Sequence, residues 1–448
     1  MVLPDIEEYI QSKNDMKEGD YNNVDHSQYN LDNCKQIFVN MLEWLKQHQH
    51  LQEICDDNKL TKEFNKRLNN EMRLSRLNRI RKSILLNVLI NFTKKEDFEN
   101  GNHYDLLKHL LRKKPSRNIS GVTIITVITA PFPDGQSFSC KHNCYYCPNE
   151  GPNEENGWQQ QPRSYLYNEP AVRRANQHGF KALNQMINRM DTYYSNGHTV
   201  DKLEIIVEGG TFTEYPIEYL ERYHRDMFYA ANIYFELRDL YPLYDRSKQD
   251  LDVSILSGLR EPLSIEEEIF INKTAKVHII GICIETRPDA IDEEWLWRFR
   301  KWGITRVQLG MQHVDNSILK KVNRGHTNEQ SLWAMQFLKD NCFKLDIHIM
   351  PDLPGSTPEI DKKMFDYVYS VTCPDQMKVY PHQIVPWTVT QKWYAKGAYV
   401  PYNEADPQTL KEVVRYSMET CPNYIRLPRV MRDIPSSYIQ CGNTDANL

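Results

Sequence analysis

Hydrophobic residues follow two different spacings along this chain, and the change from one to the other divides it. Over residues 33–110 apolar residues recur at helical spacing, as in 37–45 and 84–90, which predicts a series of helices. Residues 121–129 instead form a β-branched run, Gly-Val-Thr-Ile-Ile-Thr-Val-Ile-Thr. Such a run is typical of a strand that is buried on both faces of a parallel sheet.

Short apolar runs and helical stretches alternate after this first strand. Further strands are predicted at 203–207, 277–284, 306–310, 344–350 and 376–380, with helices at 171–189, 216–230, 292–301, 329–340 and 358–369. This alternation predicts a parallel sheet with helices outside it. The expected fold class is α/β, a partial (βα)6 TIM-like barrel with an N-terminal helical region.

Three regions are expected along the chain. Residues 1–112 form a helical and partly basic region, and residues 113–402 form the barrel. Residues 403–448 extend the barrel and contribute one more helix, at 407–418.

Composition narrows the class of protein. The chain has 448 residues, enough for more than one domain. No stretch approaches the roughly 20 apolar residues of a membrane span, and the N-terminus lacks the pattern of a signal peptide. Ten cysteines without an extracellular signal fit a reducing compartment, so a cytoplasmic protein without a membrane anchor is predicted.

Basic residues gather in the helical region although the net charge of the chain is −5. Residues 62–82 carry eight Lys and Arg against two Glu, and 112–117 hold a second basic cluster. A basic helix is more often a solvated face than a nucleic-acid site. With an acidic chain overall, nucleic-acid binding would need such a local patch.

Three cysteines follow the first predicted strand closely. Cys140, Cys144 and Cys147 have the spacing CxxxCxxC. Three thiolates in one loop can hold three irons of a cubane iron–sulfur cluster and leave the fourth iron open to another ligand. The alternative is a zinc site with His142 as fourth ligand, but zinc sites usually pair two short knuckles that lie far apart in sequence. The spacing therefore favours a cluster.

Polar motifs follow the next predicted strands, and in a βα barrel the chemistry lies at these strand ends. Gly209 and Gly210 allow the backbone to approach a ligand closely, although a tight turn explains them equally well. Glu285 and Arg287 are two residues apart and so point the same way from an extended segment. They could orient a cofactor or form a surface ion pair. Gln312 follows the fourth strand.

Three more polar side chains come from the last two strands. Lys378 and Tyr380 share one strand face, and we expect them to point into the mouth of the barrel. His348 is a weaker candidate, because a lone histidine on a strand is more often a core residue with satisfied hydrogen bonds.

The cysteine spacing resembles that of the radical S-adenosylmethionine (SAM) enzymes. In that superfamily SAM binds the open iron of the cluster, and its reductive cleavage gives a 5′-deoxyadenosyl radical. One family within it has similar segments in the same order, namely the catalytic subunit of the Elongator complex, which modifies tRNA uridine. The matching segments are 114–121, 163–170, 208–212, 284–289, 323–327, 350–354, 378–381 and 432–435.

The resemblance implies a radical SAM barrel that modifies C5 of the wobble uridine of tRNA in a carboxymethylation-type reaction. Cys140, Cys144 and Cys147 would bind a 4Fe-4S cluster. The residues expected to hold SAM are Gly209, Gly210, Glu285, Arg287 and Gln312. The residues expected near the radical are Lys378, Tyr380 and His348. The residues expected on tRNA phosphates are Arg73, Arg76, Arg79, Lys113, Lys114 and Arg117.

The resemblance covers roughly residue 113 to the C-terminus, and two departures affect it. The first cysteine lies closer to the second than in many members of the family. The family's acetyltransferase-like domain, which binds acetyl-CoA, is expected to be absent because the sequence ends at Leu448. Acetyl-CoA would then reach the barrel from a separate chain or Elongator-like subunits, or the reaction would differ.

Two other functions stay open at this point. The chain could be a non-catalytic tRNA-binding paralogue that retains the iron–sulfur cluster, although such a protein has no need of an open iron. It could also be a radical SAM enzyme that acts on another substrate, which the family-specific segments 323–327 and 432–435 disfavour.

Overall fold

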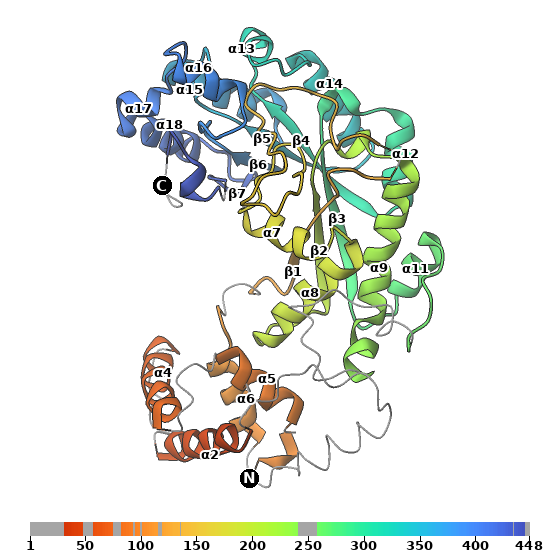
Figure 1. The fold of residues 1–448 in the computed structure, drawn as a ribbon, viewed down its shortest axis with the longest axis vertical. Helices are drawn as coiled ribbons and strands as arrows, with labels where there is room; N and C mark the ends of the chain where they lie inside the picture. Colours follow the sequence, from red (N-terminus) through yellow and green to blue (C-terminus); the bar gives the residue numbers. More distant parts are fainter. Residues whose placement is uncertain are drawn as a thin grey trace. The chain divides into compact units, whose positions relative to one another are not determined.

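The computed structural model describes residues 31–47, 57–74, 82–92, 95–98, 101–114, 119–134, 136–240, 258–432 and 434–443 (Figure 1). They fall into two compact units. The helical unit comprises described residues of 1–123, 188–202 and 234–259, and the sheet unit comprises those of 124–187, 203–233 and 260–448.

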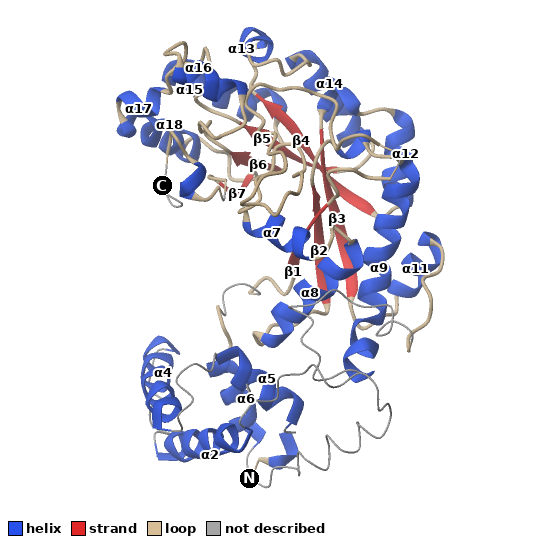
Figure 2. Cartoon of the chain, viewed as in Figure 1, coloured by secondary structure: helices blue, strands red, loops and turns tan. Residues whose placement is uncertain are grey.

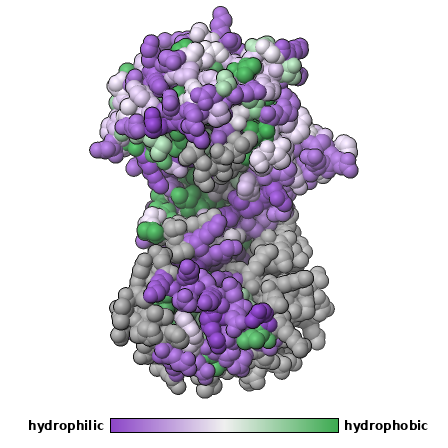
Figure 3. Space-filling model, turned by 90° about the vertical axis from the view of Figure 1, so that its left-hand side faces the viewer, coloured by the Kyte–Doolittle hydropathy of each residue, from purple (hydrophilic) through white to green (hydrophobic). Residues whose placement is uncertain are grey.

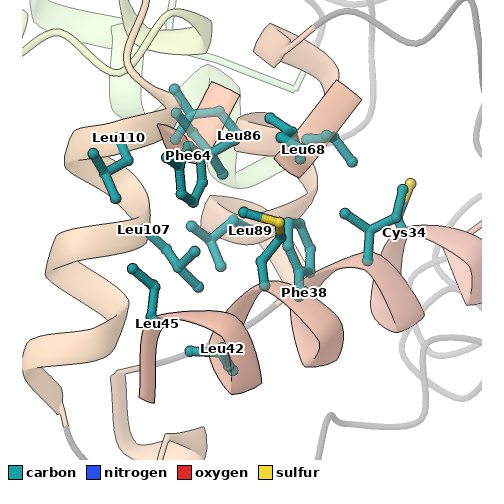
Figure 4. Packing of buried hydrophobic residues seen from close by; sticks show 14 of the residues in the cluster. Cys34, Phe38, Leu42, Leu45, Phe64, Leu68, Leu86, Leu89, Leu107 and Leu110 are labelled. Carbon is teal, nitrogen blue, oxygen red and sulfur yellow. The ribbon is translucent and has the colours of Figure 1, made fainter. Parts of the chain in front are cut away.

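Four α-helices make the core of the helical unit, which confirms the helical spacing of its sequence. Their bounds are α2 Leu31–Gln47, α4 Asp57–Leu74, α5 Lys82–Phe92 and α6 Gly101–Leu111. Phe38, Phe64 and Leu107 are buried among them (Figure 4). The rings of Trp44 and Phe64 meet edge to face at 6.3 Å. Packing of these apolar sides stabilises helices that would be marginal alone.

The second unit is built on a sheet with strand order β1-β2-β3-β4-β5-β6-β7 (Figure 2). Its strands are β1 Thr123–Ile128, β2 Lys202–Glu208, β3 His278–Thr286, β4 Ile304–Gln312, β5 Lys344–Ile349, β6 Gln376–Val379 and β7 Arg426–Arg429. The strands from β3 to β7 pair in parallel. The α/β fold class and the parallel half-barrel are confirmed, and the prediction of six strands misses β7.

Helices connect these strands, as the alternation predicts. Their bounds are α7 Pro170–Gln177, α8 Ala182–Ser195, α9 Ile217–Leu240, α11 Ile265–Asn272, α12 Glu293–Lys301, α13 Asn316–Lys321, α14 Asn328–Asp340, α15 Pro358–Tyr367, α16 Val389–Ala395, α17 Tyr402–Ala405 and α18 Pro407–Glu419. Polar side chains start several of them. Asp292 caps α12 through the Trp295 amide, and Thr327 forms a capping box at α14.

The single helix predicted over 171–189 is wrong. The chain breaks it between α7 and α8, where Gly179 and Phe180 have φ of +55° and +58°. Left-handed backbone cannot continue a right-handed helix. The amide of Phe180 instead donates to the Ala175 carbonyl, which closes the end of α7.

The surface of the described residues is mostly hydrophilic in the view of Figure 3, with hydrophobic side chains in small groups. Within these residues, no helix has the length and apolar character needed to cross a membrane.

Candidate functional site

A cavity of about 500 Å³ lies within the sheet unit, and most of its wall comes from the ends of the strands. Its volume is in the range of sites for small molecules and cofactors. Eleven residues predicted from sequence line it: Cys140, Cys144, Cys147, Gly209, Gly210, Glu285, Arg287, Gln312, His348, Lys378 and Tyr380. Segments that are far apart in the sequence therefore meet at one place.

The cysteine loop has no regular secondary structure and is held by contacts to later parts of the chain. Tyr145 donates its amide to the Val322 carbonyl at 2.9 Å and accepts at its own carbonyl from the Val389 amide at 2.9 Å. The side chain of Asn143 accepts a hydrogen bond from Arg163 at 2.6 Å. These contacts hold Asn143 and Tyr145, the two residues that flank Cys144.

Two guanidinium groups face the sulfur of Cys144. Arg324 Nη1 lies 3.5 Å from Sγ and Arg287 Nη1 lies 3.6 Å from it. A hydrogen bond from Cys147 and these two cations outweigh burial and lower the pKa of Cys144 to about 4. The hydrogen bond to Cys144, together with burial, raises the pKa of Cys147. Cys144 is therefore a thiolate, the form of cysteine that binds metals.

The donor set fits an iron–sulfur cluster. All three thiols border one cavity, and Cys140 Sγ also contacts Thr211 Oγ1 at 3.2 Å. In the described part of the chain, no group of three or more His, Cys, Asp or Glu side chains is already arranged to hold a metal ion. His142 faces Glu214, with 3.7 Å between Nε2 and Oε1.

The two glycines after β2 are required by packing. A Cβ on Gly209 would lie 1.9 Å from Thr129 Oγ1, and one on Gly210 would lie 2.1 Å from the carbonyl oxygen of Ser139. Both neighbours belong to the segment that leads into the cysteine loop. The tight approach to this segment explains the glycines, and it also places their backbone on the cavity wall.

Glu285 and Arg287 both line the cavity, but they do not pair with each other. Arg287 donates to both carboxylate oxygens of Asp289, at 2.9 and 2.8 Å. Glu285 instead accepts from the Tyr165 hydroxyl at 3.3 Å and lies 3.3 Å from His348 Nδ1. Burial would raise the pKa of Glu285, but His348 and Lys378 lower it to about 2. The cavity therefore contains a carboxylate at neutral pH.

Gln308 joins the two strands that carry His348 and Lys378. Its Oε1 accepts from Lys378 Nζ at 2.7 Å and lies 3.1 Å from His348 Nε2. The Tyr380 ring meets the His348 ring edge to face at 5.5 Å. Sequence reasoning missed Gln308. Its position four residues before Gln312 on the same strand is the signal that could have found it.

Sequence reasoning also missed residues of the cavity wall itself. Arg432 donates to Glu169 at 2.8 Å, and its guanidinium lies 5.1 Å from the centre of the Tyr165 ring. Arg324 contacts Cys144, as described above. Their segments, 163–170, 323–327 and 432–435, were recognised in the sequence without a role for these side chains. The cavity wall includes Tyr165, Glu169, Arg324 and Arg432.

The predicted tRNA-binding residues lie in the helical unit or outside the described residues. A hollow of about 570 Å³ includes Trp44, Lys66, Arg67 and Arg73 in its wall. Arg73 also donates to Asn70 at 3.0 Å. Two further predicted residues, Lys113 and Lys114, are exposed just after α6. Arg76, Arg79 and Arg117 lie outside the described residues.

Comparison with known families and proteins bears on this site. Residues 236–368 match the radical SAM superfamily, and residues 374–448 match the radical SAM C-terminal domain. The tRNA uridine(34) acetyltransferase of Methanocaldococcus infernus is 35% identical over 346 residues, which are 77% of this chain and 58% of that protein. The protein of the same name from Dehalococcoides mccartyi is 34% identical over 75% of this chain and 64% of its own length.

Elongator complex protein 3 of Homo sapiens is 31% identical over 75% of this chain and 56% of its own length. Among solved structures, the archaeal Elp3 of Methanocaldococcus infernus with an N-terminal deletion has a TM-score of 0.53 and 29% identity. That match covers 71% of this chain and 59% of the other. The chain thus spans less than two thirds of the length of these relatives. It contains a radical SAM domain, and these proteins are its homologues.

Proposed function

We propose that this chain is a radical SAM enzyme of the Elongator catalytic-subunit type, which modifies C5 of the wobble uridine of tRNA. The observation that carries this proposal is the convergence of all eleven residues predicted for the cluster, SAM and the radical on one cavity. Homologues named for uridine 34 of tRNA support the substrate. We therefore infer that this chain is a transferase that modifies tRNA.

Three cysteines would hold the 4Fe-4S cluster, and the cavity wall around Gly209, Gly210, Glu285, Arg287 and Gln312 would hold SAM. When bound, these groups supply the reductive chemistry that generates a carbon-centred radical. Arg287 and Arg324 favour the thiolate of Cys144. The backbone of Gly209 and Gly210 can approach a ligand because neither residue has a side chain.

The polar network that Gln308 forms with His348 and Lys378 of the cavity wall would position the substrate. Gln308 holds Lys378 at 2.7 Å, and Glu285 lies 3.3 Å from His348, so these side chains have little freedom to reorient. Preorganised dipoles and charges act strongly where water is excluded. His348, Lys378 and Tyr380 would therefore fix the base and the co-substrate next to the radical.

The helical unit would bind the tRNA through phosphates. Its hollow combines an aromatic ring, Trp44, with the cations of Lys66, Arg67 and Arg73. Phosphate contacts of this kind bind without sequence preference and weaken with salt. The wobble base would come from the anticodon loop, which is single-stranded and therefore exposes its bases at low energetic cost.

The test begins with anaerobic reconstitution of the chain with iron and sulfide. Cleavage of SAM is then measured with and without tRNA, and with and without acetyl-CoA as the proposed co-substrate. Nucleosides from the tRNA are analysed by mass spectrometry. We expect SAM cleavage that depends on tRNA and a modified uridine. The matched control is Cys144→Ala, which removes one of the three proposed cluster ligands.

Two outcomes would contradict the proposal in different ways. Tight tRNA binding without SAM cleavage would indicate the non-catalytic paralogue that retains a cluster. SAM cleavage that tRNA does not stimulate would indicate a different substrate. Dependence on an added partner, whether an acetyl-CoA-binding chain or an Elongator-like subunit, would be seen as activity restored when that partner is present.

A further inference from the structure

Arg324 is a buried cation of the cavity wall, and sequence reasoning gave it no role. It lies three residues after α13 and is 6% exposed. Nε of its guanidinium donates to His326 Nε2 at 3.0 Å, and Nη2 donates to the Gly310 carbonyl at 2.5 Å. These two hydrogen bonds hold the group in place, so that Nη1 faces Cys144 Sγ at 3.5 Å.

The backbone around Arg324 is fitted to this position. A Cβ on Gly310 would lie 2.6 Å from Arg324 Nη2, so a larger residue there would displace the guanidinium. The residue before Arg324, Asn323, donates from its side chain to the Asn143 carbonyl at 2.8 Å. Asn143 immediately precedes Cys144. The segment that carries Arg324 is therefore docked on the cysteine loop.

Arg287 faces the same sulfur, but its charge is balanced by a carboxylate. Its Nη1 lies 3.6 Å from Cys144 Sγ, while Nε and Nη2 donate to the two carboxylate oxygens of Asp289 at 2.9 and 2.8 Å. Arg287 and Arg324 thus present the same chemical group to the same atom at nearly the same distance. They differ in what offsets their charge.

No carboxylate pairs with Arg324 within the part of the chain that the structure describes. Its hydrogen bonds go to a carbonyl, an imidazole and the thiolate of Cys144. Burial, together with the cations of Arg324 and Arg287, lowers the pKa of His326 to about 3, so this imidazole is neutral. A buried charge without a partner is strongly unfavourable. Cys144 is therefore the counter-ion of Arg324.

A positive charge at this place would act on an iron–sulfur cluster held by the three thiolates. Such a cubane is anionic, and it gains one more negative charge when it is reduced. Net charge and hydrogen bonds to the sulfurs are among the features that set its reduction potential. A buried cation at a ligand sulfur stabilises the reduced state more than the oxidised state, because charges interact strongly where water is excluded.

We propose that Arg324 raises the reduction potential of the cluster by holding an uncompensated positive charge against Cys144. This inference rests on the proposed cluster and not on the identity of the substrate. On reduction, one electron passes from an external low-potential reductant to the cluster, and no bond forms or breaks. Arg324 keeps its proton throughout, since arginine is not deprotonated in proteins. It acts through Cys144 and is a positioning residue.

The test measures a potential and needs no turnover. The reconstituted chain is titrated anaerobically with dithionite in the absence of SAM, the reduced cluster is followed by electron paramagnetic resonance, and iron is counted in each variant. Arg324→Met removes the charge, and Arg324→Lys keeps it. Asp289→Asn removes the carboxylate that offsets Arg287. Arg415→Met is the control, because Arg415 is exposed and pairs with Glu419.

We expect Arg324→Met to lower the ratio of reduced to oxidised cluster at a fixed potential about tenfold, which is a fall of about 59 mV for one electron. Arg324→Lys should recover much of this loss. Asp289→Asn should shift the potential upward, since it leaves the charge of Arg287 without its carboxylate. Shifts of opposite sign, in variants that keep their iron, distinguish an effect of charge from a merely structural one.

An unchanged potential in Arg324→Met with full iron content overturns the inference. So does a loss of SAM affinity, measured by calorimetry, without a change in potential, which would assign Arg324 to SAM binding instead. If Arg324→Met loses its iron, Asp289→Asn decides, and the absence of an upward shift contradicts the inference. A wild type that takes up no iron removes the proposed cluster and this inference together, whereas iron uptake with unshifted potentials removes this inference alone.

Discussion

Arg432 and Glu169, which are 263 residues apart in the chain, form an ion pair with 2.8 Å between Nη2 and Oε1. Arg432 also donates to the carbonyl of Ser164 at the turn before α7. The pair therefore joins the C-terminal segment to the wall of the cavity. Both side chains are largely buried, with 23% and 9% exposure.

Breaking this pair should destabilise the sheet unit. Arg432→Met leaves the Glu169 carboxylate buried without its cation, which costs about 3 kcal/mol. The free energy of unfolding from urea titration measures this loss. The control is Arg415→Met, because Arg415 pairs with Glu419 at 3.7 Å on an exposed surface, where ion pairs contribute less than about 1 kcal/mol. Equal losses in the two variants would contradict a special role for the pair.

Reconstitution should give about four irons per chain, as three thiolates and one open iron imply for a cubane. Cys144→Ala should lose most of this iron, measured by colorimetric assay together with the visible absorption of the cluster. Cys342→Ser is the control, because Cys342 is exposed and lies outside the loop. Stoichiometric zinc without iron uptake would show that the zinc alternative is correct.

Binding of tRNA should weaken steeply with salt, since it depends on phosphate neutralisation. Reversal of Arg73, Arg76 and Arg79 to Glu should lower the affinity for all tRNAs alike. It should also reduce the slope of log affinity against log salt by roughly two to three. Fluorescence anisotropy over a salt series measures both. Arg415→Glu on the sheet unit is the control, and an identical slope in the triple variant would place the tRNA site elsewhere.

His224 should make the protein less stable in acid. It is fully buried, stacks on Trp302 with ring centres 5.4 Å apart, and donates from Nδ1 to the Leu220 carbonyl. Burial lowers its pKa to about 4, whereas a histidine in the unfolded chain has its ordinary pKa of about 6.5. Between these values the unfolded state binds the extra proton, so stability falls as pH falls from 6.5 toward 4, by roughly 3 kcal/mol.

His224→Phe removes this titrating group from the core and should flatten the dependence over that range. Urea midpoints at several pH values check it, with the half-buried His278→Gln as control. A wild-type protein that is equally stable at pH 6.5 and pH 4 would contradict the expectation, as would a variant with the same pH profile.

Short-range patterns in the sequence determined the class of fold and eleven of the residues that line the cavity. Alternating strands and helices imply a parallel sheet, whose strand ends meet at one edge. That rule alone brings Glu285, His348 and Lys378 near the cysteine loop. The cysteine spacing is local, so it could be interpreted without knowledge of the fold.

Only the tertiary structure decided which side chains pair. Glu285 contacts His348 and not Arg287, because strand order places β3, β4 and β5 side by side. Arg287 turns to Cys144, which is 143 residues away. The left-handed backbone at Gly179, with φ of +55°, also depends on how the chain turns between α7 and α8. Pairing energies act through space over a few ångströms, and a one-dimensional pattern contains no information about such distances.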